Sequence, residues 1–319
     1  MKRDSNIELF RCFCMFFVVL NHVCFYNKLC GNSWFMWHVP GFLIVSGFFG
    51  VRFSFGKIVK LLGITYACWY LTIPLRSPTT FINYLLPHGG WYLPFYLLLI
   101  VFCPVLNSAL ENKINHKAVT QAITLMMVVG WLPLLSKNPH LDRIMVPGMQ
   151  GHGLLLMMVI YITARLLFMH HIPSQYPRSL VWFALFIIGI VLNGVMGIRI
   201  PDAVCYASPL VIATSVSGFL AFKTMRPLPM GFSRLINFIS PSMYGVYVLH
   251  LCCIDRFQYF GGGVDLENIW GRVGIENSIA HAMMRAVFLF FMCVLIDLLR
   301  RGLMYVGTCL TKYLRHCGN

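Results

Sequence analysis

The chain has few charged residues. Of its 319 residues only 11% are Asp, Glu, Lys or Arg, whereas a soluble globular domain carries about a quarter. So small a set of charges cannot cover a water-facing surface of this size. The shortage excludes a soluble enzyme, and the 58% share of hydrophobic residues excludes an intrinsically disordered chain.

Acidic residues are scarcer than basic ones. The chain has 10 Asp and Glu against 25 Lys and Arg, for a net charge of +15. In a soluble protein this excess would suggest a nucleic-acid partner. Here most basic residues lie between long apolar runs, where they hold loops on the cytoplasmic side of a membrane. We therefore expect no nucleic-acid partner.

The chain also lacks the motifs of metal and nucleotide sites. Its 12 cysteines include no CxxC pair and no Cys/His cluster with zinc spacing. Most of them lie inside apolar segments, where cysteine behaves as a small hydrophobe. The sequence contains no glycine-rich nucleotide loop and no Ser-His-Asp arrangement. We expect neither a disulfide scaffold nor a bound metal or resident cofactor.

Long apolar runs are what the sequence has in abundance, and the mean hydropathy is +0.73. About twenty apolar residues span the hydrocarbon core of a bilayer as a helix. Ten candidate spans lie near 9–27, 34–51, 58–75, 91–110, 119–136, 150–169, 180–198, 204–222, 236–254 and 281–305. The connections are short, so we expect one transmembrane domain over residues 1–319. The fold class is all-α, a polytopic integral membrane protein of about ten transmembrane helices.

The distribution of Lys and Arg predicts the orientation of these spans. With the amino terminus in the cytoplasm, that side receives sixteen Lys and Arg residues and the opposite side receives seven. Cytoplasmic loops carry the excess of positive charge. The sequence therefore predicts that both termini are cytoplasmic.

Two ionisable residues share one face of the first span. Arg11 and His22 are eleven residues apart, which at about 100° per residue is three turns plus about 20°, or about 16 Å along the axis. Glu8 precedes Arg11 by one turn and is placed to pair with it. Ionisable groups inside a span usually face a cavity or a partner. The pattern favours a functional site over the alternative, in which Arg11 snorkels to the interface and His22 only bonds a carbonyl.

Four segments carry motifs in the order known from one family. The first span has arginine, ten residues and histidine, which are Arg11 and His22. The second segment matches through Pro40, Phe42, Ser46, Gly47 and Phe48, and the third through Trp91, Tyr92 and Leu93. The fourth matches through Ser242, Tyr244, Tyr247 and His250, with Val248 in place of leucine. In these segments the chain resembles the membrane-bound acyltransferase family 3, bacterial enzymes that O-acylate cell-surface and exported glycans. The resemblance covers residues from about 4 to 255.

The resemblance implies transfer of an acyl group from a cytoplasmic acyl-CoA, most simply acetyl-CoA, to a hydroxyl of a glycan or lipid-linked sugar. Many members carry an Arg-x-Arg pair after the second span that engages the donor. Here this region offers Arg52, Lys57 and Lys60 instead, and lysine binds phosphate without the planar fork of arginine. Either these cations bind the CoA phosphates beside Arg11, or they only anchor the segment in the cytoplasm.

The resemblance also implies that the thioester arm of the donor runs inward toward His22. A neutral imidazole suits a general base that takes the proton of a sugar hydroxyl, and a covalent acyl-histidine is the other route. The oxyanion of the tetrahedral intermediate needs hydrogen-bond donors. The candidates are Asn21, Tyr92, Ser242 and Tyr244.

The remaining candidates are His38, Trp91 and His250, which lie in or near the resembling segments. Each histidine either orients a substrate or bonds a carbonyl at a helix interruption, and we favour the structural role. The alternative function is a transporter or flippase of a lipid-linked glycan, with Arg11 and His22 along its path. We favour the enzyme because no internal repeat is visible. The expected location is the bacterial cytoplasmic (inner) membrane, in contact with its lipids.

Overall fold

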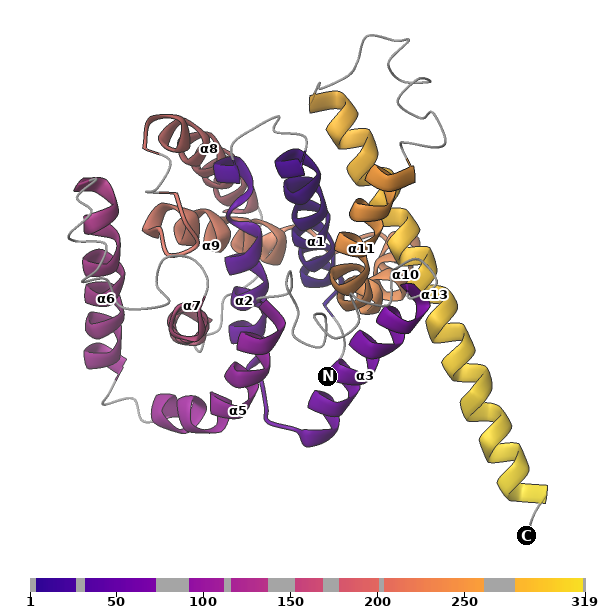
Figure 1. The fold of residues 1–319 in the computed structure, drawn as a ribbon. Helices are drawn as coiled ribbons and strands as arrows, with labels where there is room; N and C mark the ends of the chain where they lie inside the picture. The colour runs from indigo at the N-terminus through magenta and orange to yellow at the C-terminus, as the bar shows by residue number, and fades with distance from the viewer. Residues whose placement is uncertain are drawn as a thin grey trace.

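The computed structural model describes residues 4–26, 32–72, 92–111, 116–136, 153–168, 178–200, 204–260 and 279–317. The regular structure of these residues is entirely helical (Figure 1). The predicted all-α class is therefore confirmed.

The helices follow the predicted spans closely. The first half of the chain forms α1 (Ser5–Tyr26), η1 (Asn32–Phe35), α2 (His38–Phe49), α3 (Phe55–Thr72), α5 (Tyr92–Glu111) and α6 (His116–Ser136). The second half forms α7 (Leu154–Phe168), α8 (Arg178–Arg199), α9 (Pro209–Thr224), α10 (Met230–Ile239), η5 (Ser240–Ser242), α11 (Met243–Phe260) and α13 (Ile279–Cys317). Each of the ten predicted spans coincides with an α-helix. The span expected near 236–254 is interrupted at its start by η5, where Pro241 lacks the N–H that a continuous helix requires.

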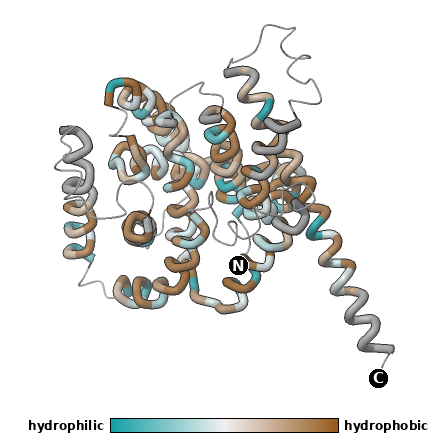
Figure 2. The backbone as a smooth tube through the Cα atoms, viewed as in Figure 1, coloured by the Kyte–Doolittle hydropathy of each residue, from teal (hydrophilic) through white to brown (hydrophobic). Residues whose placement is uncertain are grey.

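Four helices of the described residues are long and apolar enough to cross a membrane. They contribute the segments Ser5–Cys24, Tyr92–Glu111, Arg178–Arg199 and Ala282–Cys309. Ser33–Phe49, Leu154–Leu167 and Pro209–Thr224 are apolar but shorter. Many large hydrophobic side chains are exposed, among them Phe102 of α5 and Ile188 of α8, and Figure 2 shows how hydrophobic the residues of these helices are. This surface suits contact with lipid rather than water.

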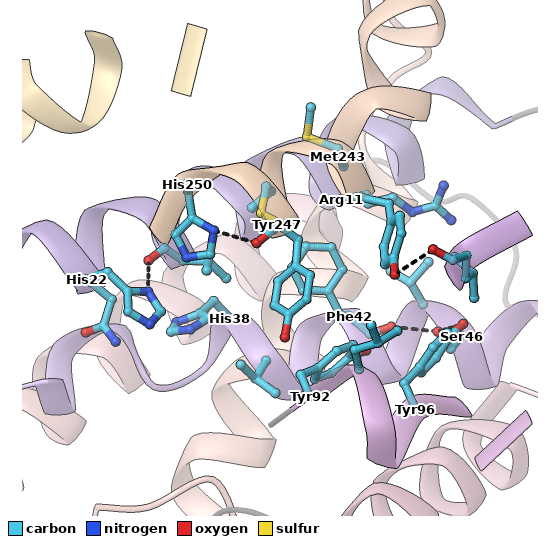
Figure 3. A pocket seen from close by; sticks show the side chains of 18 of the residues that line it. Arg11, His22, His38, Phe42, Ser46, Tyr92, Tyr96, Met243, Tyr247 and His250 are labelled. Atoms are coloured by element: carbon cyan, nitrogen blue, oxygen red, sulfur yellow. Dashed lines mark hydrogen bonds between the residues drawn. The ribbon is translucent and has the colours of Figure 1, made fainter. Parts of the chain in front are cut away.

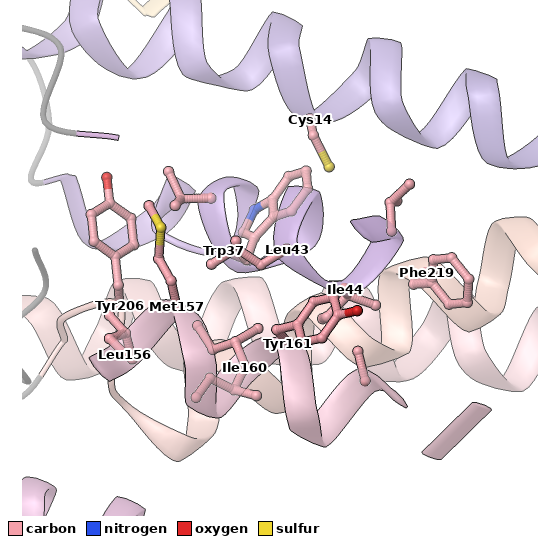
Figure 4. Close-up of a cluster of buried hydrophobic side chains, with 14 of the residues drawn as sticks. Cys14, Trp37, Leu43, Ile44, Leu156, Met157, Ile160, Tyr161, Tyr206 and Phe219 are labelled. Atoms are coloured by element: carbon pink, nitrogen blue, oxygen red, sulfur yellow. The ribbon is translucent and has the colours of Figure 1, made fainter. Parts of the chain in front are cut away.

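The first helix lies at the centre of the molecule. In α1 67% of the apolar segment is buried, against 22% in α8. One face of α1 places Phe10 and Cys14 in a hydrophobic cluster with residues of α2, α7 and α9 (Figure 4). Another face places Val18 and Val19 in a second cluster with α11 and α13. The helix with the predicted Arg–His pair is thus shared by both cores.

A glycine lets α2 approach α7 closely. A Cβ atom on Gly47 would lie 2.5 Å from the Cβ of Ala164 and 2.7 Å from the carbonyl oxygen of Tyr161. Small residues at such positions allow close helix packing in membranes. The neighbouring Ser46 lines a cavity instead. Its hydroxyl donates to the carbonyl oxygen of Phe42, one turn earlier, at 3.1 Å.

The last helix is joined to α11 through a buried acidic residue. Asp297 accepts hydrogen bonds from Arg300, one turn later, and a Cβ on Gly245 would lie 2.1 Å from its Oδ1. This intrahelical pair accounts for an ionisable residue inside the last span. Arg301 instead donates to the carbonyl oxygen of Phe238 at 3.1 Å.

The first and the last helix run in opposite directions. In Figure 1, α1 rises from the amino terminus, whereas α13 descends to the carboxyl terminus, so the two ends of the chain point to the same side of the molecule. This arrangement agrees with termini on one side of a membrane. That this side is the cytoplasm remains a prediction from the Lys and Arg distribution.

Candidate active site

A cavity of about 650 Å³ opens between α1, α2, α3, α5 and α11. Eight of the residues expected to bind substrate or catalyse line it: Arg11, Asn21, His22, His38, Lys57, Tyr92, Tyr244 and His250. The first and last of the helices that supply them, α1 and α11, are more than 200 residues apart in the chain, so the fold has brought distant sequence segments to one place. Trp91 lies outside the described residues.

The cavity has two chemically different ends, which Figure 3 shows clearly. His22, His38 and His250 gather at one end, and Arg11 lies at the other. Aromatic side chains, including Phe42, occupy the middle. Because Arg11 and His22 both line the cavity, their predicted position on one face of α1 is confirmed.

All three histidines hold the same ring nitrogen against a backbone carbonyl. Nδ1 of His22 lies 2.8 Å from the oxygen of Val18, and Nδ1 of His250 lies 2.7 Å from the oxygen of Tyr247. Nδ1 of His38 bonds the carbonyl oxygen of the residue three positions before it. A carbonyl oxygen only accepts, so each Nδ1 carries the proton, and the free lone pair of the neutral ring lies on Nε2.

The three rings differ in their accessibility. His22 is half-buried, whereas His38 is 1% and His250 0% exposed. The rings of His22 and His250 lie 4.9 Å apart in an edge-to-face arrangement. In the part of the chain that the structure describes, no group of three His, Cys, Asp or Glu side chains is arranged to hold a metal ion. Of the three, His22 is therefore the imidazole best placed to meet a substrate.

A buried carboxylate fixes the arginine at the other end. Nη1 of Arg11 donates to Oε2 of Glu8 at 2.8 Å, as the spacing predicts. The same oxygen accepts a hydrogen bond from the hydroxyl of Ser240 in η5. Glu8 does not line the cavity, so its contacts orient Arg11 and tie α1 to η5.

The basic residues that follow α2 are only partly gathered at the cavity. Lys57, in the first turn of α3, lines the arginine end. Its backbone N–H lies 3.4 Å from Oγ of Ser54, which caps this helix. Arg52 and Lys60 are exposed and do not line the cavity.

Comparison with known families decides the class of this protein. The model of the acyltransferase 3 family, described as an acyltransferase domain, matches residues 4–299. The chain belongs to the acyltransferase 3 family. It is therefore a multi-pass membrane enzyme that transfers acyl groups, and the predicted resemblance is confirmed. No curated protein and no solved structure matches the chain significantly.

The family match includes every residue that lines the cavity. It favours the acyltransferase over the transporter as the class of protein. The match extends into α13, beyond the motifs that the sequence shows, and ends at residue 299, between Asp297 and its partner Arg300.

Two of the expected oxyanion donors are engaged elsewhere in this acyltransferase. The hydroxyl of Tyr244 lies 2.7 Å from Oγ1 of Thr65 and joins α11 to α3. Ser242 does not line the cavity, and its hydroxyl accepts a hydrogen bond from Arg301 at 3.0 Å. Tyr92 lines the cavity, and Oδ1 of Asn21 is buried with no hydrogen-bond partner among the described residues.

Several cavity residues of the acyltransferase were assigned no role from the sequence, among them the motif residue Tyr247. Tyr247 lies between the two ends of the cavity (Figure 3), 6.0 Å from the ring of His250. Its ring lies 5.8 Å from that of Tyr92 at the start of α5. Helical spacing was the available signal, because Tyr247 precedes His250 by three residues and so shares its face.

Two further tyrosines line the cavity. Tyr96 stacks on Tyr92 with ring centroids 5.5 Å apart, and the spacing of four residues indicates this contact. Tyr206 comes from the turn before α9 and lies 6.1 Å from the ring of His38. No sequence signal places a turn residue at a cavity formed by other helices.

Proposed function

We propose that this acyltransferase moves an acyl group, most simply acetyl, from acyl-CoA to a hydroxyl of a cell-surface or exported glycan, or of its lipid-linked precursor. The chain would act as one transmembrane domain in the bacterial cytoplasmic membrane. The supporting observation is the cavity itself, which has cations at one end and a half-buried imidazole at the other.

The cationic end suits the donor. Acyl-CoA carries several phosphates at the end away from its thioester, and Arg11 and Lys57 offer two positive charges to them. Arg11 is 30% exposed despite its ion pair with Glu8, so its remaining N–H groups are accessible to a ligand. The pantetheine arm then extends along the aromatic middle toward His22.

The histidine end suits the chemistry. Nε2 of His22 takes the proton of the acceptor hydroxyl while that oxygen attacks the thioester carbonyl carbon. The tetrahedral intermediate collapses with cleavage of the carbon–sulfur bond, and the CoA thiolate recovers the proton from His22. The phenols of Tyr92 and Tyr247 lie in the middle of the cavity (Figure 3), where they can donate to the developing oxyanion.

The alternative route uses the same nitrogen as a nucleophile. Nε2 of His22 would attack the thioester to give an acyl-imidazole and free CoA, and the acceptor oxygen would then take the acyl group. Acid quenching of a reaction with labelled acetyl-CoA distinguishes the routes, because only this one leaves label on the protein.

The test is acetyl transfer by the purified protein without a transmembrane gradient. We expect His22→Ala to bind CoA normally and to lose about 10²- to 10⁴-fold in kcat, the usual contribution of a positioned base. His116→Ala is the matched control, because His116 bonds the carbonyl of Leu110 outside the cavity. A folded His22→Ala variant with normal transfer would remove His22 from the mechanism. Failure of the wild type to transfer acetyl to any glycan would refute the proposed substrates.

A further inference from the structure

We propose that Arg165 of α7, together with the Gly50–Val51 turn, forms a second phosphate-binding subsite for the donor, outside the cavity. This inference rests on the proposed use of acyl-CoA. It assigns a ligand group to a residue outside the recognised motifs.

The turn after α2 is shaped around the guanidinium of Arg165. Gly50 has φ +69°, a left-handed conformation that favours glycine. A Cβ on Gly50 would lie 2.9 Å from Nη1 of Arg165 and 3.0 Å from its Cζ. The absence of a side chain at residue 50 therefore lets the arginine lie against the backbone of the turn.

Two side chains, the buried Tyr161 and the half-buried Asn107, hold this turn in place. The backbone N–H of Val51 donates to the hydroxyl of Tyr161 at 3.1 Å, and this hydroxyl donates to Oδ1 of Asn107 at 2.8 Å. Nδ2 of Asn107 closes the ring by donating to the carbonyl oxygen of Val51 at 2.9 Å. Tyr161 is fully buried in the first hydrophobic cluster (Figure 4). The turn is thus preorganised rather than shaped by a ligand.

Arg165 lacks a counter-ion among the described residues. The ion pairs formed there are Arg11–Glu8, Lys223–Asp4 and Arg300–Asp297. Nε of Arg165 is buried and has no hydrogen-bond partner in the same part of the chain. A half-buried guanidinium without an anion is unfavourable, and its planar fork matches the oxygens of a phosphate. The arrangement therefore suits a phosphate ligand.

The neighbouring charges have the same sign. Lys57 lies seven residues after Gly50, in the first turn of α3. Arg52 follows Gly50 by two residues and is exposed. Such a cluster of cations creates a positive potential that attracts anions.

The subsite lies beyond the arginine end of the cavity. Ser46 lines that end and precedes Gly50 by one turn of α2, about 6 Å along the axis. A ligand that extends past Ser46 and Lys57 therefore arrives at the turn. Acyl-CoA has a diphosphate and a separate 3′-phosphate, so the inner cations suit one group and Arg165 suits the other.

The experiment measures the Kd of CoA, dephospho-CoA and pantetheine for the purified wild-type protein and for Arg165→Gln. Weakly bound ligands are measured by competition. We expect the Kd of CoA to rise about tenfold or more, while the Kd of pantetheine is unchanged. An unchanged Kd of dephospho-CoA would assign Arg165 to the 3′-phosphate, and a raised one to the diphosphate. An equal rise for all three ligands, or none for CoA, would overturn the proposal.

Several controls separate binding from folding and from lipid effects. Arg165→Lys keeps the charge and should recover part of the CoA affinity, whereas Arg178→Gln, on exposed α8, should leave it unchanged. The phosphate of an anionic lipid offers similar chemistry, so binding is repeated with phosphatidylglycerol added to a neutral detergent. If Arg165→Gln weakens binding of the lipid but not of CoA, the donor subsite is refuted. Acetyl transfer by the wild type is measured separately, so that its failure refutes the proposed function without affecting the binding result.

Discussion

Replacing Glu8 by alanine tests whether the buried carboxylate orients the arginine end of the cavity. The Glu8 side chain is 7% exposed and that of Arg11 is 30% exposed. Removing one partner of a fully buried ion pair destabilises a protein by about 3–5 kcal/mol. Because Arg11 is partly exposed and solvent screens its charge, we expect a loss of about 1–3 kcal/mol from the pair.

The substitution also removes the acceptor of the Ser240 hydroxyl, which is 2% exposed. A buried donor without a partner adds about 1 kcal/mol or more. We therefore expect Glu8→Ala to lower the free energy of unfolding by about 2–4 kcal/mol. Glu8→Gln keeps an acceptor for both partners and should lose less.

The assay is unfolding by SDS in mixed micelles, applied to Glu8→Ala, Arg11→Ala and the double variant. The two single changes should couple by about 1–2 kcal/mol, because both remove the same interaction. Asp4→Ala is the matched control, since Asp4 and Lys223 form a more exposed pair and should lose less than about 1 kcal/mol. Additive effects of Glu8→Ala and Arg11→Ala would refute the argument.

Three further predictions concern the donor, the packing and the topology. Lys57→Gln should raise the KM for acetyl-CoA with little change in kcat, whereas Lys60→Gln should leave the KM unchanged. Equal rises in KM for the two variants would show that lining the cavity does not matter for donor binding. Gly47→Ala should lower the free energy of unfolding by about 1–3 kcal/mol, because its Cβ would lie 2.5 Å from a side chain of α7. Gly63→Ala, with nothing within 4 Å of the new Cβ, is the control and should be neutral in the same unfolding assay. A reporter fused after Asn319 should lie in the cytoplasm, and a periplasmic signal would overturn the predicted orientation.

The sequence predicts well what depends on local geometry. Apolar run length located the helices, and the 3.6-residue period placed Arg11 and His22 on one face of α1. The pairing of Arg11 with Glu8 follows from the same period. These features need no knowledge of the neighbouring helices.

What depends on neighbouring helices could not be predicted in the same way. Lys57 and Lys60 share a helix face, yet only Lys57 reaches the cavity, because α11 and α5 determine where the cavity ends. Tyr244 belongs to a recognised motif, but its hydroxyl forms a hydrogen bond with Thr65 of α3. Arg165 is an ordinary loop-flanking cation in the sequence, and its position against Gly50 exists only once α2 and α7 have packed.

The central position of α1 affects the order in which the protein is made. Glu8 bonds Ser240, which lies 232 residues later in the chain, and the second hydrophobic cluster joins α1 to α13. Ribosomes add about 5–20 residues per second, so α1 waits roughly 10–50 s for the segment that completes its polar contacts. During this time Glu8 already has Arg11 as its partner within α1, but the Ser240 hydroxyl is missing. The cavity is complete only once α11 has joined α1, so activity arises late in biogenesis.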